Sequence, residues 1–273
     1  RDLGLVKFDE PFKRLFTQGM LTAECFYREQ PDGSKRWYYP YEINIEYDEK
    51  GRPCRVTAKD DGLPVVSGGI EKMSKSKNNV VEPRDIIKQF GADTARTFVM
   101  FAGPPDQSAE GCYRFLRRLW NWCYARHDEI HASACKVDIS TAPKHVKDML
   151  REVYQTLQQA ESDFDRMQFN TVVSAAMKMM NALDGFEGTD EVSPCSRKLA
   201  LSLLLRVLYP LAPHITTALW QELGFVKDFG VEIIDAPWPE VCKEALVADE
   251  IKLMIQVNGK LRGQIMVPAQ ASR

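Results

Sequence analysis

Residues 72–79 read Lys-Met-Ser-Lys-Ser-Lys-Asn-Asn, and this octet is the part of the sequence best equipped for chemistry. Its three lysines supply ammonium donors, and Ser74 and Ser76 add hydroxyls that can bond to phosphate oxygens or cap a helix. A run of charges is most often only a solvated turn, which is the plain alternative for this segment. These donors would also suit a loop that binds a polyphosphate, but residue types alone favour the solvated turn.

The residues on either side of the octet define the elements that must position it. An apolar stretch typical of a strand precedes it, and Gly68 and Gly69 give the backbone freedom to move. Pro83 follows the octet and presets the first turn of a helix. The pattern therefore predicts a mobile lid on a hinge, between a strand and a helix.

A small β region is predicted ahead of the octet. Aromatic and β-branched residues gather in three short segments bounded by turn residues: 37–39, 43–47 and 54–57. Taken in order, these segments predict a β meander. Before them, residues 8–27 are compatible with a short helix that runs into a strand at Gly19.

The remainder of the chain is predicted to be mainly helical. Apolar residues recur at helical spacing over 150–164, 169–183 and 199–211, and Pro213 opens a shorter helix. Amphipathic helices joined by short loops predict a bundle, in which the methionines of the second stripe fill the core. Near the end, two apolar segments flank Asn-Gly at 258–259, the strongest short signal for a β hairpin. The predicted fold class is mainly α with α+β parts.

The octet resembles the signature loop of class I aminoacyl-tRNA synthetases. Residues 82–87 and 91–96 are similar to the helix pair that follows this loop in the same enzymes. Within the class, the chain resembles the bacterial-type leucyl-tRNA synthetases from Asp2 to Pro268. The β region before the octet resembles their leucine-specific insertion, which the isoleucyl, valyl and methionyl relatives lack.

The resemblance implies a division of the chain into five parts. Expected in order are a remnant of a Rossmann-like catalytic domain (1–27), a leucine-specific-like β insert (28–67), a second catalytic-domain remnant with the octet (68–110), a helical anticodon-binding-type bundle (111–240) and the start of a truncated C-terminal domain (241–273). Both chain ends are expected to be cuts through a longer protein. The sequence contains no H-x-G-H motif and no threonine-rich editing domain. We therefore expect the fragment to be inactive alone.

The resemblance also implies roles for the octet. The family activates leucine with ATP and transfers it to the terminal adenosine of tRNA(Leu), with Mg²⁺ expected alongside ATP. The residues expected to bind ATP are Lys72, Met73, Ser74, Lys75 and Ser76. Lys75, assisted by Lys72, is the expected catalytic residue, because an ammonium beside the developing phosphoryl charge stabilises the transition state more than the ground state.

Three arginines at i, i+3 and i+4 form a second candidate site. Arg114, Arg117 and Arg118 share one face of a helix, and apolar residues on another face are expected to pack against the bundle. These arginines could contact tRNA phosphates, or they could lie on a solvated face with internal salt bridges. Their position in the family favours tRNA. Residues 109–112 depart from the family pattern, because a short tryptophan- and glycine-containing stretch is skipped there, which leaves the start of this helix open.

Composition excludes several classes of protein. The net charge of −2 means that any RNA contact depends on local basic patches. Seven cysteines without a C-x-x-C pair fit neither a disulfide framework nor a structural zinc site, and they favour a reducing cytoplasm. No apolar run is long enough to span a membrane.

His127 and His131 have the spacing of a helical metal pair but lack the glutamate of the zincin motif, so we expect no metal site.

Three alternatives stay open at this point. The first is a fragment of an isoleucyl-, valyl- or methionyl-type synthetase, against which the β insert and the absence of a cysteine zinc site argue. The second is a non-catalytic helical module that binds RNA, and the third is a plain scaffold with no RNA affinity. Salt-sensitive RNA binding without nucleotide dependence would identify the RNA-binding module.

Overall fold

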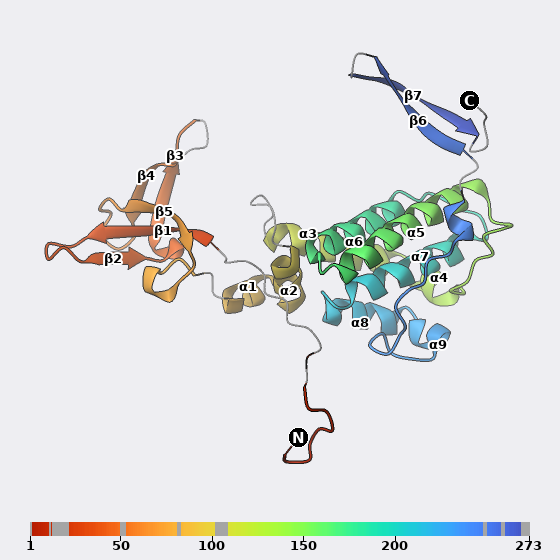
Figure 1. The fold of residues 1–273 in the computed structure, drawn as a ribbon, viewed down its shortest axis with the longest axis horizontal. Helices are drawn as coiled ribbons and strands as arrows, with labels where there is room; N and C mark the ends of the chain where they lie inside the picture. Colours follow the sequence, from red (N-terminus) through yellow and green to blue (C-terminus); the bar gives the residue numbers. More distant parts are fainter. Residues whose placement is uncertain are drawn as a thin grey trace. The chain divides into compact units, whose positions relative to one another are not determined.

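The computed structural model describes residues 2–10, 12, 22–49, 53–80, 83–101, 109–247, 250–257 and 260–268. The chain divides into two compact units, residues 1–85 and residues 86–273. Among the described residues, the first unit, called here the β unit, contains five strands, and the second, the helical unit, contains most of the helices (Figure 1). The described chain thus has the predicted fold class, mainly α with α+β parts.

The β unit is built from two small antiparallel sheets. Its strands are β1 (Thr22–Glu29), β2 (Lys35–Tyr38), β3 (Ile43–Tyr47), β4 (Pro53–Ala58) and β5 (Val66–Lys72). One sheet has the order β2-β1-β5, and β3 pairs with β4 in the other. Side chains from both sheets meet in one core: Phe26, Tyr38, Ile43, Ala58 and Val65. The predicted strands are present, and the predicted meander is wrong, because β2 and β3 do not pair.

The connection between β2 and β3 explains the difference. It forms the 3₁₀ turn η1 (Pro40–Glu42), in which Pro40 has no N–H for a strand ladder. The Tyr39 backbone N–H donates to Glu42 Oε2 at 2.7 Å, which closes the turn. The chain therefore changes direction before β3. The predicted domain boundaries at 27/28 and 67/68 fall inside β1 and β5, and the division into five parts stays a prediction.

Arg28 fastens the segment that leads into β5. Its Nη1 and Nη2 donate to the two carboxylate oxygens of Asp61 at 2.6 and 3.0 Å, and its Nε donates to the Pro64 carbonyl at 3.0 Å. The side-chain hydrogen bond from Arg28 is the main reason that the pKa of Asp61 falls to about 2. The turn before β5 is therefore held against β1 by a bidentate ion pair.

The helical unit contains the predicted bundle. Helix α1 (Pro83–Phe90) crosses the boundary between the two units. The helices that follow it are α2 (Ala92–Phe101), α3 (Ala109–Ala125), α4 (His127–Ala132), α5 (Lys144–Asp165), α6 (Phe169–Asp184), α7 (Ser193–Leu208), α8 (Pro213–Glu222) and α9 (Phe225–Phe229). The three predicted apolar stripes are α5, α6 and α7. The 3₁₀ turn η3 (Glu244–Leu246) precedes the predicted hairpin, which is present as β6 (Glu250–Val257) and β7 (Lys260–Pro268). Its Asn-Gly turn lies outside the described residues.

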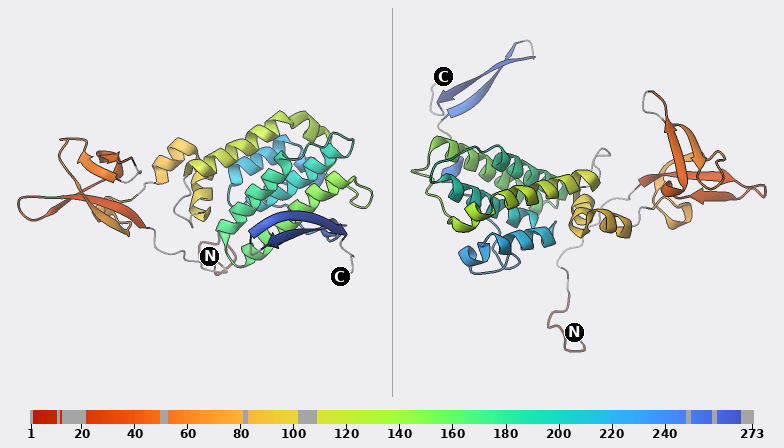
Figure 2. Two further views of the ribbon diagram at one scale, coloured as in Figure 1. Left: turned by 90° about the horizontal axis from the view of Figure 1, so that it is seen from above. Right: turned by 180° about the vertical axis from the view of Figure 1, so that it is seen from behind.

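The core of the helical unit lies where α5, α6 and α7 pack together, and Figure 2 shows these helices side by side. Leu150, Leu157, Val173 and Leu204 are each 0% exposed. Met180 is also fully buried among them, which confirms that the methionine stripe fills the core. No helix in the described part of the chain is long and apolar enough to cross a membrane.

Asp93 on α2 caps the start of α8. It is buried, and its Oδ2 accepts the Ile215 backbone N–H at 2.6 Å. Its Oδ1 accepts the His214 backbone N–H at 3.3 Å and lies 2.7 Å from His214 Nδ1. A carboxylate at a helix N-terminus satisfies free N–H groups and complements the helix dipole. The start of α8 is thus capped by a side chain from another helix.

We expect Asp93→Ala to lower the free energy of unfolding by about 1–2 kcal/mol, the usual cost of removing a helix cap. Urea denaturation followed by circular dichroism measures this change. The matched control is Asp165→Ala, at an exposed position at the end of α5. Equal stability of the two variants would contradict the capping role.

Candidate active site and nucleic-acid interface

Residues 72–79, called here the lysine loop, connect β5 to the segment before α1. Lys72 is the last residue of β5, and Lys75–Lys77 form the 3₁₀ turn η2. Asn78 follows in the left-handed conformation, with φ 51°. Pro83 begins α1, as predicted. The loop therefore lies between a strand and a helix, in the setting that its flanking residues predict.

The three lysines of the loop differ in their surroundings. Lys77 forms an ion pair with Glu71 on β5, and its Nζ lies 5.5 Å from the centroid of the Trp37 ring. Lys72 and Lys75 are exposed, and within the described ranges neither one forms an ion pair. Lys77 thus stabilises the loop, while the two predicted catalytic lysines remain accessible to a ligand.

The remaining residues expected to bind ATP lie around Lys75. Ser74 and Ser76 place their hydroxyl oxygens 3.1 Å apart, so either one can donate to the other. Met73 and Ser74 are half-buried, whereas Ser76 is exposed. An exposed ammonium beside hydroxyl groups can bind the oxygens of a phosphate. The half-burial of Met73 suits a side chain that anchors the loop by packing.

Gly68 and Gly69 belong to β5, and Gly68 is the residue without a partner at an irregularity in the pairing with β1. Gly69 pairs with Cys25 beside an irregularity in register and has φ +80°, a conformation that favours glycine. A Cβ atom at Gly68 would lie 2.8 Å from Cys25 Sγ. Both glycines are therefore required by local strand geometry, which explains them without a hinge. Motion of the lysine loop stays a prediction.

Asn79 is the residue of this site that the sequence reasoning missed. Its side chain is 1% exposed and bonds to the Ser74 N–H and to the carbonyls of Ala23 and Lys72. The available signal was a pair of asparagines directly after a charged run. An asparagine amide can donate and accept at once, which suits a residue that closes a loop.

The predicted arginine face is present on α3. Arg114, Arg117 and Arg118 are exposed and line a hollow of about 400 Å³ together with Arg126. Arg118 Nη2 donates to Asn181 Oδ1 on α6 at 2.6 Å. In the part of the chain that the structure describes, the three exposed arginines form no ion pair, which leaves their charges available to phosphate groups.

The opposite face of α3 is buried, as predicted. Phe115, Leu119 and Trp122 have exposed fractions of 6%, 0% and 4%. The guanidinium of Arg126 lies 4.7 Å from the centroid of the Trp122 ring, so this arginine is held by a cation–π contact. The helix itself begins at Ala109, within the stretch that departs from the family pattern, and residues 102–108 before it lie outside the described residues.

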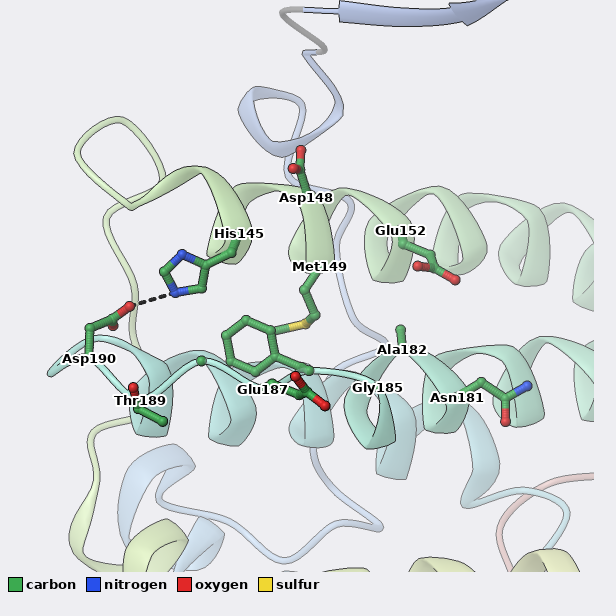
Figure 3. Close-up of a pocket in the computed structure, with 12 residues that line it drawn as sticks. His145, Asp148, Met149, Glu152, Asn181, Ala182, Gly185, Glu187, Thr189 and Asp190 are labelled. Atoms are coloured by element: carbon green, nitrogen blue, oxygen red, sulfur yellow. Dashed lines mark ion pairs between the residues drawn. The ribbon is translucent and has the colours of Figure 1, made fainter. Parts of the chain in front are cut away.

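A second hollow, of about 810 Å³, lies beside α5 and the connection between α6 and α7 (Figure 3). Four carboxylates line it, those of Asp148, Glu152, Glu187 and Asp190. Asp190 Oδ2 lies 2.5 Å from His145 Nε2. Burial raises the pKa of Asp190, but hydrogen bonds from Ser193 and the Val192 N–H, among others, lower it more, so the net pKa is below its usual value. This acidic hollow repels phosphate groups.

The histidine pair does not form a metal site within the described structure. The rings of His127 and His131 stack with centroids 5.8 Å apart. His127 Nδ1 lies 2.9 Å from Asp128 Oδ1, and its Nε2 lies 3.1 Å from the Glu222 carbonyl. The described residues contain no group of three His, Cys, Asp or Glu side chains that could hold a metal ion.

Two protein families match parts of the chain, and one of the matches includes the lysine loop. Residues 61–110, which include the lysine loop, match the family of class I tRNA synthetases (I, L, M and V). Residues 146–272 match the anticodon-binding domain of tRNA ligase. The leucine–tRNA ligases of Methylibium petroleiphilum and Cupriavidus metallidurans are each 54% identical to the chain over 281 residues, covering 100% of it.

The chain is similar to leucine–tRNA ligases over its whole length. It spans 31% of the length of these two relatives. A solved structure also matches, the LeuRS of Agrobacterium radiobacter K84 in a ternary complex with tRNA and LeuAMS. The match has a TM-score of 0.63 and 27% identity, and it covers 74% of this chain and 26% of that chain. The resemblance to leucyl-tRNA synthetases is thereby confirmed.

The different surroundings of the loop lysines predict different reactivity. We expect limiting acetic anhydride to acetylate Lys75 before Lys77, because Lys77 is engaged by Glu71 and Trp37. Peptide mass spectrometry measures the order of modification. Replacing Glu71 with glutamine is expected to raise the reactivity of Lys77 and to leave that of Lys75 unchanged. Equal rates for the two lysines in the unmodified chain would contradict the described contacts.

Proposed function

We propose that the chain is part of a leucine–tRNA ligase that activates leucine with ATP and transfers it to the terminal adenosine of tRNA(Leu). The observation that carries the proposal is the 54% identity with leucine–tRNA ligases across the whole chain, which includes the lysine loop. The segment contributes the loop and the arginine-bearing bundle. The activity belongs to the whole enzyme, which we place in the cytoplasm.

The proposed chemistry explains the need for accessible lysines. An oxygen of the leucine carboxylate attacks the α-phosphorus of ATP, a new P–O bond forms, and the bond to the leaving pyrophosphate breaks. Negative charge grows on the phosphoryl oxygens during this displacement. Lys75, with Lys72 near the other end of the loop, stabilises that charge. ATP enters as its Mg²⁺ complex, so the ion accompanies the substrate.

The arginine face supplies the second half of the proposed function. Arg114, Arg117 and Arg118 present a concentrated positive surface on a chain whose net charge is −2. Guanidinium groups bind phosphates in bidentate geometry and release counterions from RNA. The acidic hollow beside α5 would repel the same backbone. RNA binding is therefore assigned to the exposed face of α3.

Amino-acid-dependent exchange between ATP and pyrophosphate tests the catalytic role. The enzyme is the Methylibium petroleiphilum ligase with its matching segment replaced by this chain. We expect leucine-dependent exchange and little with isoleucine, valine or methionine. Lys75→Ala is expected to lower the rate by roughly 10²–10³-fold, the usual loss for one such electrostatic donor.

Lys178→Ala, which removes an exposed lysine from α6, is the control for the loss of one charge. An absence of exchange with all four amino acids, together with intact RNA binding, would favour a non-catalytic RNA-binding module. Full activity of Lys75→Ala would contradict the role of the loop.

Salt-dependent tRNA binding tests the arginine face. We expect Arg117→Ala to weaken binding and to reduce the slope of log K against log salt by about 1, because one phosphate contact is lost. Fluorescence anisotropy over a range of salt concentrations measures this slope. Arg166→Ala removes the same charge from an exposed position at the end of α5 and should leave the slope unchanged. Identical slopes for both variants would count against the assignment.

A further inference from the structure

Asn78 and Asn79, called here the asparagine clasp, join the end of the lysine loop to all three strands of its sheet. Asn79 Oδ1 accepts the Ser74 backbone N–H at 2.8 Å. Asn79 Nδ2 donates to the Ala23 carbonyl on β1 at 3.2 Å and to the Lys72 carbonyl on β5 at 3.3 Å. One buried amide thus fixes the loop across the residues that precede Lys75.

Asn78 makes the connection to the third strand. Its Nδ2 donates to the Trp37 carbonyl on β2 at 3.0 Å. Its backbone lies in the left-handed region, which asparagine tolerates better than most residues other than glycine. The adjacent Lys77 contacts the ring of the same tryptophan. The end of the loop is therefore attached to β2 through both a backbone carbonyl and an aromatic side chain.

The clasp restrains the loop without neutralising its lysines. Three lysines close in sequence repel one another, and neutralising them with carboxylates would remove the charge that a phosphate ligand needs. The described structure pairs Lys77 with Glu71 and leaves Lys72 and Lys75 exposed. The amides of Asn78 and Asn79 restrain the backbone without adding a charge. Restraint is thus supplied by neutral groups, and the catalytic cations stay unpaired.

We propose that Asn78 and Asn79 are positioning residues that hold the lysine loop in the geometry from which Lys75 reaches the reacting phosphate. This inference rests on the proposed function of Lys75 and extends it to two residues that need not touch the substrate. Fixing a catalytic group in advance lowers the barrier, and a misplacement of about 1 Å can reduce a rate by roughly 100-fold. The clasp therefore acts on the rate of activation through Lys75.

The test uses leucine-dependent ATP–pyrophosphate exchange by the same chimeric full-length ligase. Asn79→Ala removes all three side-chain bonds and is expected to lower the rate by roughly 10–100-fold. Asn78→Gly removes only the amide, because glycine adopts the left-handed conformation without strain, and a loss of roughly 3–10-fold is expected. Asn44→Ala removes an exposed asparagine from β3 and is expected to stay within about twofold.

Three further measurements separate positioning from general stability. The melting temperature, the KM for leucine and the affinity for tRNA are expected to stay unchanged in Asn78→Gly, the variant that is least disruptive to folding. In the double variant Lys75→Ala/Asn79→Ala, the clasp substitution is expected to add little to the loss from Lys75→Ala alone. Such non-additivity is the mark of residues that act as one unit.

The outcomes distinguish this inference from the proposed function. Normal exchange by Asn79→Ala and Asn78→Gly, with a large loss in Lys75→Ala, would overturn the clasp and leave the proposed function intact. Additive losses in the double variant, or a parallel fall in melting temperature and leucine binding, would assign the asparagines a purely structural role. Normal exchange by Lys75→Ala would overturn both.

Discussion

Burial of helix α7 on nearly all sides is the constraint around which the helical unit is organised. Most of its 16 residues are buried, and they include leucines on opposite sides of the helix. Each fully buried leucine contributes roughly 1.5–3 kcal/mol through removal of apolar surface from water. Helices α5 and α6 both pack against α7. The apolar faces of α5 and α6 can therefore be fully buried only when this central helix is in place.

The same burial brings charged residues of α7 into the interior, where they need partners. Lys198 is 2% exposed, and its Nζ donates to the Ser133 carbonyl at 2.9 Å and pairs with Asp228 at 2.6 Å. Arg197 pairs with Glu129 at 2.8 Å. An uncompensated buried charge typically costs about 3–5 kcal/mol, so these pairs are requirements of the fold. They connect α7 to the short helices α4 and α9, which are too short to be stable alone.

In the β unit, the ion pairs that hold the turns lie near the surface. Arg28 and Asp61 fasten the turn before β5, and Lys77 and Glu71 pair at the edge of the lysine loop. The catalytic candidates Lys72 and Lys75 are left without such partners among the described residues. The loop, which we propose binds a polyphosphate, therefore uses ion pairs for its framework and neutral amides for its closure. The paired Lys77 lies only a few residues from the unpaired Lys72 and Lys75.

The sequence by itself determined the long helices of the bundle, the final hairpin and the location of the lysine loop, because these depend on local patterns. Helical periodicity marked α5, α6 and α7, and residues flanking Asn-Gly marked the final hairpin. The octet and the exposed arginines of α3 were found from residue type and spacing alone. Their specific roles remain proposals, since residue type limits the chemistry but does not fix where a ligand lies.

Only the tertiary structure decided how these local elements meet. Strand pairing in the order β2-β1-β5, the cap of α8 by Asp93 from 121 residues away, and the bonds of Asn79 to two strands all join segments that are distant in sequence. Gly68 is the clearest example, because its sequence context fits a flexible hinge as well as a closely packed strand. The close approach of Cys25 Sγ shows that the strand packing by itself requires a glycine there. Such contacts depend on the whole packing arrangement, which no local pattern encodes.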